Sequence, residues 1–567
     1  MHHVQKSPKN RSLIVGASLS VGAVVLVTAA GFGVHALLQK DNALPNAFYV
    51  SASGDDKADG RTPQTAWKTL ARVSEARLAA GEQVLLEGGS RFRGQIVIDH
   101  GADDPQHPLV IGSYGDGRAQ IVNDQDSAVV VANRSGVTVQ DLEIVGPGAA
   151  VSNSDGIAVY NDKSSPQRQR GIVIQRVSVA GFKHGIAAGA VAGAPGFDGL
   201  DIHDALVKEN RLSGLFTYGS DFDPAHPTYS HTNVRISRVE AAGNTGDPTL
   251  TTNSGSGIVL GSVEDGIVEY STAHHNGALS DTIEGPAGIW TYDSTRIRIE
   301  HNLAYNNTTG EADGHGFDLD QNVSDSTLEY NLSYDNAGAG YMLFSNANNQ
   351  THRNNQVRFN VSVNDATASG FYGAITIFGG TQGPDSGTGV FDAQVYHNTV
   401  VTKAHDGVIP PTVLVLGNLH DIKVLNNVFV ANTGAQLTRA KEFTPDGITF
   451  GGNVYYAERT GRPFEWNGEL YSTLAAWRAS SEQELMAGRP VGVETNPDLR
   501  GLIGSPTSIR NASQLKDINL RLDNGSPLVG TGVDLGALKI DRGREDYFAD
   551  ELTKSYDAGA AAVRAGR

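Results

Sequence analysis

The sequence predicts an all-β solenoid in which short parallel strands stack on one another. Short β-type runs recur along the chain with no helical pattern between them, and strands opened by glycine alternate with these runs. An asparagine also returns at matching places, with intervals of 29, 29, 38 and 29 residues, at Asn302, Asn331, Asn360, Asn398 and Asn427. A period near 29 residues made of strands and turns is typical of a repeat architecture. A βαβ fold would need a crossover helix in every unit.

Each class of element can be placed by its residues. The β-type runs begin at residues 137, 172, 234, 297, 357 and 422, and the strands opened by glycine or alanine at 156, 185, 214, 257 and 374. Because buried amides must be paired, the recurring asparagines are interpreted as a structural ladder at a turn. At the N-terminal end, residues 67–80 predict an amphipathic helix that caps the stack, and residues 84–98 predict two strands.

The most informative stretch runs from Gly285 to Asn346. Three strands in it can be aligned, at residues 288–293, 316–321 and 340–345. Alternate residues of a strand face opposite sides. One side is mostly apolar and is predicted to face inward; it carries Ile289, Thr291, Phe317, Leu319, Tyr341 and Leu343. The other side is predicted to face outward into solvent and carries Trp290, Tyr292, Asp318, Asp320, Met342 and Phe344.

Two carboxylates between aromatic side chains on an outward face favour a carbohydrate site. Asp318 and Asp320 are about 6.5–7 Å apart at Cβ, a spacing that suits either stereochemical class of glycosidase. Two close acids push their pKa values apart, which yields a general acid and a base. His315, just before the strand, is a candidate to tune them or relay protons. Sugar faces stack on aromatic rings; the expected substrate contacts are Trp290, Tyr292, Phe344, Tyr218 and Phe378.

Other interpretations stay open at this stage. The aspartates can be ordinary solvated residues, and His315 an ordinary turn residue. His274 and His275 lack a clear third ligand for a metal. A lyase or a C5-epimerase is the nearest enzymatic rival; both must neutralise a uronate, and arginines lie nearby in sequence at positions 296, 298, 353 and 358. A non-catalytic glycan-binding protein would use the same aromatic residues.

Composition restricts the partners. The net charge of −18 argues against a nucleic-acid partner, because phosphate binding needs a basic face. The chain has no cysteine, so it has neither a disulfide framework nor thiolate chemistry. The oligomeric state is not indicated.

The N-terminus predicts export. Residues 1–12 form a basic tail, and residues 13–38 are mostly apolar and without Asp, Glu, Lys or Arg, which is long enough to span a bilayer. This segment is interpreted as a membrane anchor, with a cleaved signal sequence as the alternative. Either reading places the body outside the cytoplasm after a linker at residues 39–46, and the anchor would attach it to the membrane.

The chain resembles the right-handed parallel β-helix proteins of the pectate-lyase-like superfamily over residues 47–456. The opening motif comprises residues 49–55, 67–70 and 81–86, and similar motifs of the tail lie at 496–498, 523–527, 544–547 and 556–560. The resemblance implies a single-stranded right-handed parallel β-helix, followed by a C-terminal extension at 457–567 that packs on it, and carbohydrate chemistry on a polysaccharide.

The resemblance also bears on metal binding. Residues 312–318 and 335–341 are similar in layout to the calcium site of family-nine pectate lyases, but only Asp313 matches one of the calcium-binding aspartates. No counterpart of the catalytic lysine of that family is found. The calcium-and-lysine mechanism is therefore not expected here, and a glycoside hydrolase is favoured because the central strands carry no outward Lys or Arg. No cofactor is assigned, and a calcium ion at Asp313 stays open.

Overall fold

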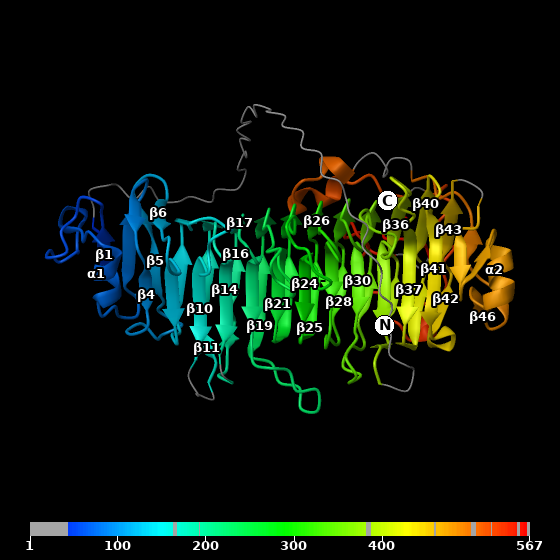
Figure 1. Ribbon diagram of the computed structural model, residues 1–567, viewed down its shortest axis with the longest axis horizontal. Helices are drawn as coiled ribbons and strands as arrows, with labels where there is room; N and C mark the ends of the chain where they lie inside the picture. The colour runs from blue at the N-terminus through cyan, green and yellow to red at the C-terminus, as the bar shows by residue number, and fades with distance from the viewer. Residues whose placement is uncertain are drawn as a thin grey trace. The chain divides into compact units, whose positions relative to one another are not determined.

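The protein is a stack of rungs that each contribute one strand to three long parallel sheets (Figure 1). The structure, a computed structural model, describes residues 43–162, 167–191, 193–380, 387–458, 461–499, 506–522, 524–552 and 556–563. Within these residues the sheets contain 16, 14 and 14 strands. Neighbouring strands of a sheet come from successive rungs, which is the topology of a β-helix and confirms the predicted all-β solenoid of parallel strands.

The first sheet contains β1 (Ala47–Val50), β2 (Gln83–Glu87), β5 (Leu109–Tyr114), β8 (Val137–Gln140), β12 (Ile172–Gln175), β16 (Asp201–His203), β19 (His231–Ser237), β22 (Val263–Glu269), β25 (Thr295–Glu300), β28 (Thr327–Glu329), β31 (Gln356–Arg358), β35 (Gln394–Tyr396), β39 (Ile422–Leu425) and β42 (Ile448–Gly451), with β11 (Gln169–Arg170) and β15 (Phe197–Asp198) beside this path.

The second sheet contains β4 (Ile96–Ile98), β7 (Val129–Ala132), β10 (Ile157–Asn161), β14 (His184–Ala190), β18 (Ser213–Tyr218), β21 (Ser256–Gly261), β24 (Ala287–Tyr292), β27 (His315–Leu319), β30 (Tyr341–Phe344), β33 (Ile375–Gly379), β37 (Pro411–Gly417), β41 (Gln436–Phe443), β44 (Phe464–Trp466) and β45 (Glu469–Tyr471).

The third sheet contains β3 (Arg91–Arg93), β6 (Ala119–Val122), β9 (Leu142–Val145), β13 (Ser178–Ala180), β17 (Leu206–Lys208), β20 (Glu240–Ala242), β23 (Thr272–His274), β26 (Leu303–Tyr305), β29 (Leu332–Tyr334), β32 (Val361–Val363), β36 (Thr399–Lys403), β40 (Val428–Asn432), β43 (Val454–Ala457) and β48 (Val493–Glu494). Two short pairs complete the strands: β34 (Val390–Phe391) with β38 (Leu419–His420), and β46 (Leu485–Met486) with β47 (Arg489–Pro490).

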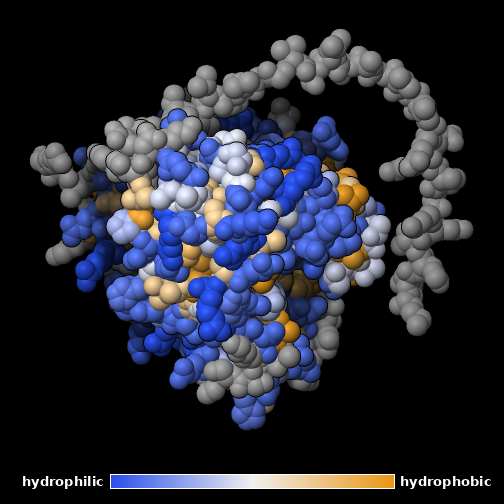
Figure 2. Space-filling model, turned by 90° about the vertical axis from the view of Figure 1, so that its left-hand side faces the viewer, coloured by the Kyte–Doolittle hydropathy of each residue, from blue (hydrophilic) through white to orange (hydrophobic). Residues whose placement is uncertain are grey.

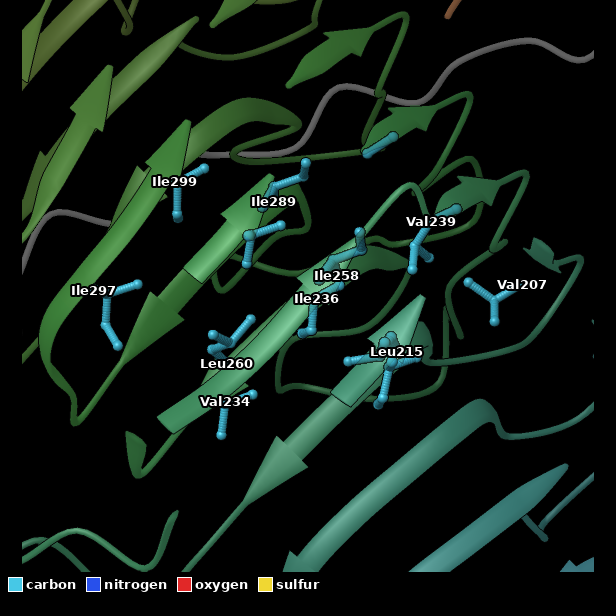
Figure 3. Close-up of a cluster of buried hydrophobic side chains, with 14 of the residues drawn as sticks. Val207, Leu215, Val234, Ile236, Val239, Ile258, Leu260, Ile289, Ile297 and Ile299 are labelled. Carbon is cyan, nitrogen blue, oxygen red and sulfur yellow. The ribbon is translucent and has the colours of Figure 1, made fainter. Parts of the chain in front are cut away.

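The core lies inside the rungs. Figure 3 shows Val207, Leu215, Ile258 and Ile289 of neighbouring strands among the apolar side chains that fill this interior. All six side chains predicted to face inward are buried: Ile289, Thr291, Phe317, Leu319, Tyr341 and Leu343. The alternation of the three central strands was therefore predicted in the correct register.

The predicted asparagine ladder exists at the turn between the first and third sheets. Asn302 Nδ2 donates to Asn331 Oδ1 at 3.1 Å, Asn331 continues to Asn360 at 3.1 Å, and the series runs through Asn398 and Asn427. Each amide also donates to a main-chain carbonyl of the rung before, as Asn331 does to Ile299 at 2.7 Å. A second ladder at the next turn was not predicted; it comprises Asn210, Asn244, Asn276, Asn307, Asn336 and Asp365.

The predicted N-terminal cap is shorter than expected. Helix α1 covers only Leu70–Glu75 of the predicted 67–80, because Ala76 returns to an extended conformation. The strands start at β1, at the beginning of the predicted range 47–456. The helix lies at the β1 end of the stack (Figure 1), where Leu70 and Val73 are buried in the core. Figure 2 shows that this end carries mostly hydrophilic residues around small hydrophobic areas. A polar end of this kind is what a solenoid needs to remain soluble.

The residues after 457 extend the stack and then fold back along it. Helix α2 (Leu474–Ser481) follows β44 and β45, and its Trp477 is fully buried against Phe464, Phe450 and Trp466. The last part contains the short 3₁₀ helices Pro506–Ser508, Ala512–Asp517 and Gly536–Leu538; two others lie at Pro63–Thr65 and Pro445–Gly447. Its apolar side chains pack on the outer face of the third sheet, where Leu515 and Phe548 lie with Leu332 and Tyr334.

The predicted basic tail and apolar segment, residues 1–12 and 13–38, lie outside the described residues. Among the residues that the structure describes, no helix is long and apolar enough to cross a membrane.

The ladder makes a prediction for stability. Asn331→Ala removes the amide that connects Asn302, Asn360 and the Ile299 carbonyl, and it leaves buried polar groups without partners. We expect the free energy of unfolding to fall by about 1–3 kcal/mol or more, measured by chemical denaturation. Asn519→Ala, at an exposed position, is the matched control and should change it by less than about 0.5 kcal/mol. Equal changes in the free energy of unfolding for the two substitutions would contradict a stabilising role of the ladder.

Candidate functional site

A pocket of about 710 Å³ opens on the outer face of the second sheet. Its floor is formed by β24, β27, β30 and β33, which contribute Trp290, Asp318, Met342, Phe344 and Phe378. Its walls are the connections that run from the third sheet to the second, at residues 275–286, 306–314 and 364–374. The pocket combines an apolar floor with several carboxyl groups, which is the composition of a small-ligand site.

The register of the sheet places the floor residues in one row. Trp290 is paired with Asp318, and Asp318 with Met342, on successive strands. Phe344 is paired with Phe378 two residues further along the strands, on the same face. Since neighbouring strands are about 4.8 Å apart, the carboxyl group of Asp318 has an aromatic ring one rung before it and a thioether one rung after it.

Asp318 is more buried than an outward strand face predicts. The expectation of a solvated position is wrong: only 7% of Asp318 is exposed, because the wall connections rise above the strand. Its Oδ1 has no hydrogen-bond partner among the described residues. Burial, together with the charges of Asp320 and Asp313, raises the pKa of Asp318 well above its usual value. The protonated form of this carboxyl group is therefore favoured.

Asp320 follows the last residue of β27 and lines the same pocket. The main-chain N–H of Gln321 donates to its Oδ1 at 2.6 Å, which favours the anion. Burial is the larger effect, and with the charges of Asp313, Asp293 and Glu284 it raises the pKa of Asp320 to about 7. Burial therefore favours the protonated form of both Asp318 and Asp320.

Asp313 has the opposite environment. The N–H of Gly285 donates to its Oδ2 at 2.8 Å, the Tyr372 hydroxyl donates to Oδ1 at 2.5 Å, and His315 Nε2 lies 3.1 Å from Oδ1. Burial acts to raise the pKa of Asp313, but the His315 ring and these donors outweigh it and lower the pKa. Its side chain is 23% exposed, so Asp313 presents an ionised carboxylate to the pocket.

His315 lies behind this carboxylate rather than in the open pocket. The imidazole is almost fully buried, and its Nδ1 accepts the N–H of Ala339 at 2.8 Å. The proton of the neutral ring is consequently on Nε2 and faces Asp313. Tyr372 packs edge-on against the same ring at 4.7 Å between centroids. This arrangement suits a residue that positions Asp313; a proton relay would first have to break the bond to Ala339.

Asp313 is a poor calcium ligand in this setting. Both of its oxygens already accept hydrogen bonds from the protein, whereas calcium needs six to eight oxygen ligands. Within the described ranges, no group of three or more His, Cys, Asp or Glu residues is placed to hold a metal ion. His274 bonds Glu240 at 3.2 Å and stacks on Tyr305, so it belongs to the outer surface of the third sheet.

The aromatic residues predicted to bind substrate separate into three groups. Trp290, Phe344 and Phe378 line the pocket. The ring of Tyr292 leans over Gly261 on the preceding strand, where a Cβ atom would lie 2.4 Å from it, and so it lines a neighbouring hollow instead. Tyr218 leans over Gly189 in the same way, and it lines neither of these two pockets.

Two parts of the site were missed from the sequence. Tyr372 is 59 residues from Asp313, and Gly285 is 28 residues from it. No local pattern connects residues in different wall connections. The one available signal was the aromatic pair Phe371–Tyr372 in the longest interval of the asparagine series, between Asn360 and Asn398.

Comparison with known proteins agrees with the fold. The family model of the right handed beta helix region matches residues 118–400. A curated lacto-N-biosidase of Bifidobacterium longum subsp. longum is 24% identical over 550 residues, which cover 78% of this chain and 33% of the relative. The chain thus spans about a third of the length of the curated relative that it matches.

Solved structures similar to the chain include a lacto-N-biosidase of glycoside hydrolase family 136 from Eubacterium ramulus, with a TM-score of 0.48, 19% identity, and coverage of 71% of this chain and 67% of that one. A pectate lyase has a TM-score of 0.41 and 13% identity, with coverage of 92% and 96%. The matching family model, together with three stacked parallel sheets, identifies the chain as a right-handed parallel β-helix protein, as the sequence predicted.

Proposed function

We propose that the protein is a glycoside hydrolase whose active site is the pocket around Asp313, Asp318 and Asp320. The observation that carries this proposal is the uneven environment of three acids in one aromatic-lined pocket: burial raises the pKa of Asp318 and Asp320, whereas the hydrogen-bond donors around Asp313 lower its pKa. Groups whose pKa values are pushed apart are the ones that divide acid and base roles. A curated relative named lacto-N-biosidase supports a carbohydrate-active protein.

Hydrolysis of a glycosidic bond needs one proton donor and one anion. The Asp318–Asp320 pair supplies the proton, which passes to the oxygen of the leaving sugar as its bond to the anomeric carbon breaks. Asp313 remains ionised and faces the developing positive charge on the sugar ring, or activates the attacking water. That water adds its hydroxide to the anomeric carbon, and its other proton returns to a carboxylate.

The aromatic residues of the pocket and the residues behind Asp313 have supporting roles. Trp290, whose indole N–H is fixed by a 3.0 Å hydrogen bond to Ser256 Oγ, offers a ring face for a sugar. Phe344 and Phe378 provide a second apolar surface one and two rungs beyond the acids. His315 and Tyr372 hold Asp313 in place and keep it charged; they act through Asp313 and are positioning residues.

The substrate class follows from the pocket and the relative. A volume of about 710 Å³ accommodates a few sugar rings, and a lining that has five acidic side chains, among them the ionised Asp313, and no Lys or Arg would repel a uronate. We therefore propose a neutral oligosaccharide. The curated relative is a lacto-N-biosidase, so an aryl lacto-N-bioside is the first substrate to test, followed by a panel of neutral glycans.

The four arginines that would be needed for an elimination reaction form ion pairs outside the pocket. Arg296 pairs with Glu264 and Asp265, and Arg358 with Glu329, on the first sheet. Arg353 and Arg298 likewise pair with Asp392 and Glu300. Since none of the four arginines lines the pocket, hydrolysis is favoured over a lyase or C5-epimerase reaction. Variants of the acids that still bind the glycan but no longer cleave it would distinguish a hydrolase from a protein that only binds glycans.

The acids can be tested by substitution. Asp313→Asn, Asp318→Asn and Asp320→Asn should each lower kcat by at least about 100-fold, the low end for loss of an acid or base. Trp290→Ala should mainly raise KM. Asp517→Asn is the control, because Asp517 lies on the exposed surface and does not line the pocket. Full activity in all three variants, on a substrate that the native chain cleaves, would place the active site elsewhere.

The raised pKa values predict a pH-dependent stability. The fold raises the pKa of Asp320 from about 3.8 to about 7, so the folded state binds the proton more tightly than the unfolded state. Ionisation of Asp320 in the folded state lowers the free energy of unfolding. This loss is absent below about pH 4, grows between about pH 4 and pH 7, and is complete above about pH 7. Asp320→Asn should therefore raise the melting temperature by a few degrees at pH 8 and by less at pH 4.

Thermal unfolding followed by circular dichroism at both pH values tests this expectation. Asp517→Asn, on the exposed surface, is the control and should show no such pH dependence. A melting temperature of Asp320→Asn that equals or falls below that of the native chain at pH 8 would contradict the proposed burial of this acid.

We also propose that residues 1–12 stay in the cytoplasm and that residues 13–38 anchor the body outside it. Basic residues before an uninterrupted apolar run support this orientation. Protease added to intact spheroplasts should digest the body of the full chain, while a cytoplasmic marker enzyme stays intact. Protection of the residues after 45 would contradict the orientation; release of the body into the medium would show that the segment is a cleaved signal.

A further inference from the structure

A second hollow of about 370 Å³ adjoins the first on the same outer face of the second sheet. This distal pocket is lined by Lys183, His184, Leu212, Phe216, Val259 and Tyr292, and it shares Asn253, Glu284 and Trp290 with the pocket that contains the acids. The two hollows therefore adjoin at Trp290 and follow one another along the sheet.

The register of the strands aligns the distal pocket with the acids. Phe216 is paired with Val259, Val259 with Trp290, and Trp290 with Asp318. Phe216 is thus three rungs, or about 14 Å, from Asp318 along the sheet. The small side chain of Val259 between the two rings leaves the hollow open, so Phe216 and Trp290 bound its two ends.

The rings are held in fixed positions around this hollow. Phe216 stacks on His184 at 4.9 Å between centroids and on Tyr218 at 5.5 Å. The ring of Tyr292 leans toward the hollow because Gly261 beneath it has no side chain. Fixed rings whose faces or edges border an open groove are suited to the apolar faces of sugar rings.

The distal pocket also contains a polar group without a protein partner. His184 is only 8% exposed, and its Nδ1 is 2.6 Å from Ser213 Oγ. Its Nε2 makes no hydrogen bond within the described part of the chain, although the residue lines the pocket. Burial and the neighbouring charges of Lys183 and Arg211 lower the pKa of His184 to about 3, so the ring stays neutral. A buried neutral imidazole with one free nitrogen is suited to a sugar hydroxyl.

We propose that the distal pocket is a sugar-binding subsite, which makes the substrate an extended neutral oligosaccharide that reaches from the acids across Trp290 to Phe216. This inference rests on the proposed function and adds the length and direction of the substrate. One sugar of the chain packs between Phe216 and Tyr292 and bonds His184 Nε2. The sugars between it and the cleaved bond cross the shared boundary at Trp290.

The test compares short and long substrates with the full chain. The short substrate is an aryl glycoside that occupies only the pocket with the acids; the long ones are an oligosaccharide series of increasing length that carries the same cleaved linkage. Phe216→Ala removes the ring, and Phe216→Leu removes it while keeping an apolar side chain in case the alanine variant folds poorly. Tyr160→Ala is the matched control, because Tyr160 lies on the same outer face but lines neither hollow.

We expect both Phe216 variants to lower kcat/KM for the longer oligosaccharides by about tenfold and to leave the aryl glycoside unchanged. Tyr160→Ala should change neither. An equal loss on short and long substrates, or no loss on the long ones, would overturn the distal subsite.

Calorimetric binding of the same series separates this inference from the proposed function. A native chain that cleaves no member would refute hydrolysis. Even in that case, the subsite would be supported if the native chain bound longer oligosaccharides more tightly than short ones and the Phe216 variants did not. Binding that does not depend on length in the native chain would refute it.

Discussion

The register between successive rungs is the constraint on which the rest of the structure depends. A one-residue slip in a parallel sheet would exchange inward and outward side chains, and it would move Asp318 into the core. The asparagine ladders oppose this slip because each amide bonds both its counterpart on the next rung and a carbonyl of the previous one. The row formed by Phe216, Val259, Trp290, Asp318 and Met342 exists only in that register.

This rigid floor supports an unfavourable arrangement of charge. Asp313, Asp318 and Asp320 are partly withdrawn from water in one pocket, and burial raises the pKa of two of them. Asp313 receives several donors that stabilise its anion, Asp320 receives one from the Gln321 N–H, and Asp318 Oδ1 receives none from the described residues. The interior of the β-helix supplies the stability that allows this, since functional sites commonly store strain that the surrounding structure compensates. Uneven hydrogen bonding, rather than distance alone, distinguishes the carboxyl groups.

The fold could be predicted from the sequence because its signals are local and repeated. Alternation within the central strands assigned both faces correctly, and the asparagine period identified one ladder. The second ladder was not found because its first members are 34, 32 and 31 residues apart rather than 29, and because its last member is an aspartate, Asp365. Helix α1 is shorter than its apolar periodicity indicated, since residues from Ala76 onward turn into the first rung instead of extending the helix.

The site could be predicted only where it lies on strands. Asp318, Asp320 and Trp290 were found because a strand fixes the direction of each side chain. The partners of Asp313 come from separate connections, and neither Tyr372 nor Gly285 has a position that periodicity can assign. The direction of Tyr292 depends on Gly261 of another strand. Glycine one rung before an outward tyrosine recurs at Gly189 and Tyr218, so this signal is present in the sequence once the register is known.

The wall connections explain why the pocket forms at this rung and not at others. The connections at residues 275–286, 306–314 and 364–374 are long and carry Glu284, Asp313 and Tyr372 above the sheet. The connection at 335–340 is shorter and lies close to the sheet, because the N–H of Ala339 donates to Nδ1 of the buried His315. This short connection lies between the longer ones at 306–314 and 364–374, and the space above β27 and β30 therefore remains open. The repeat therefore supplies a straight row of side chains, and unequal connections convert part of that row into a pocket.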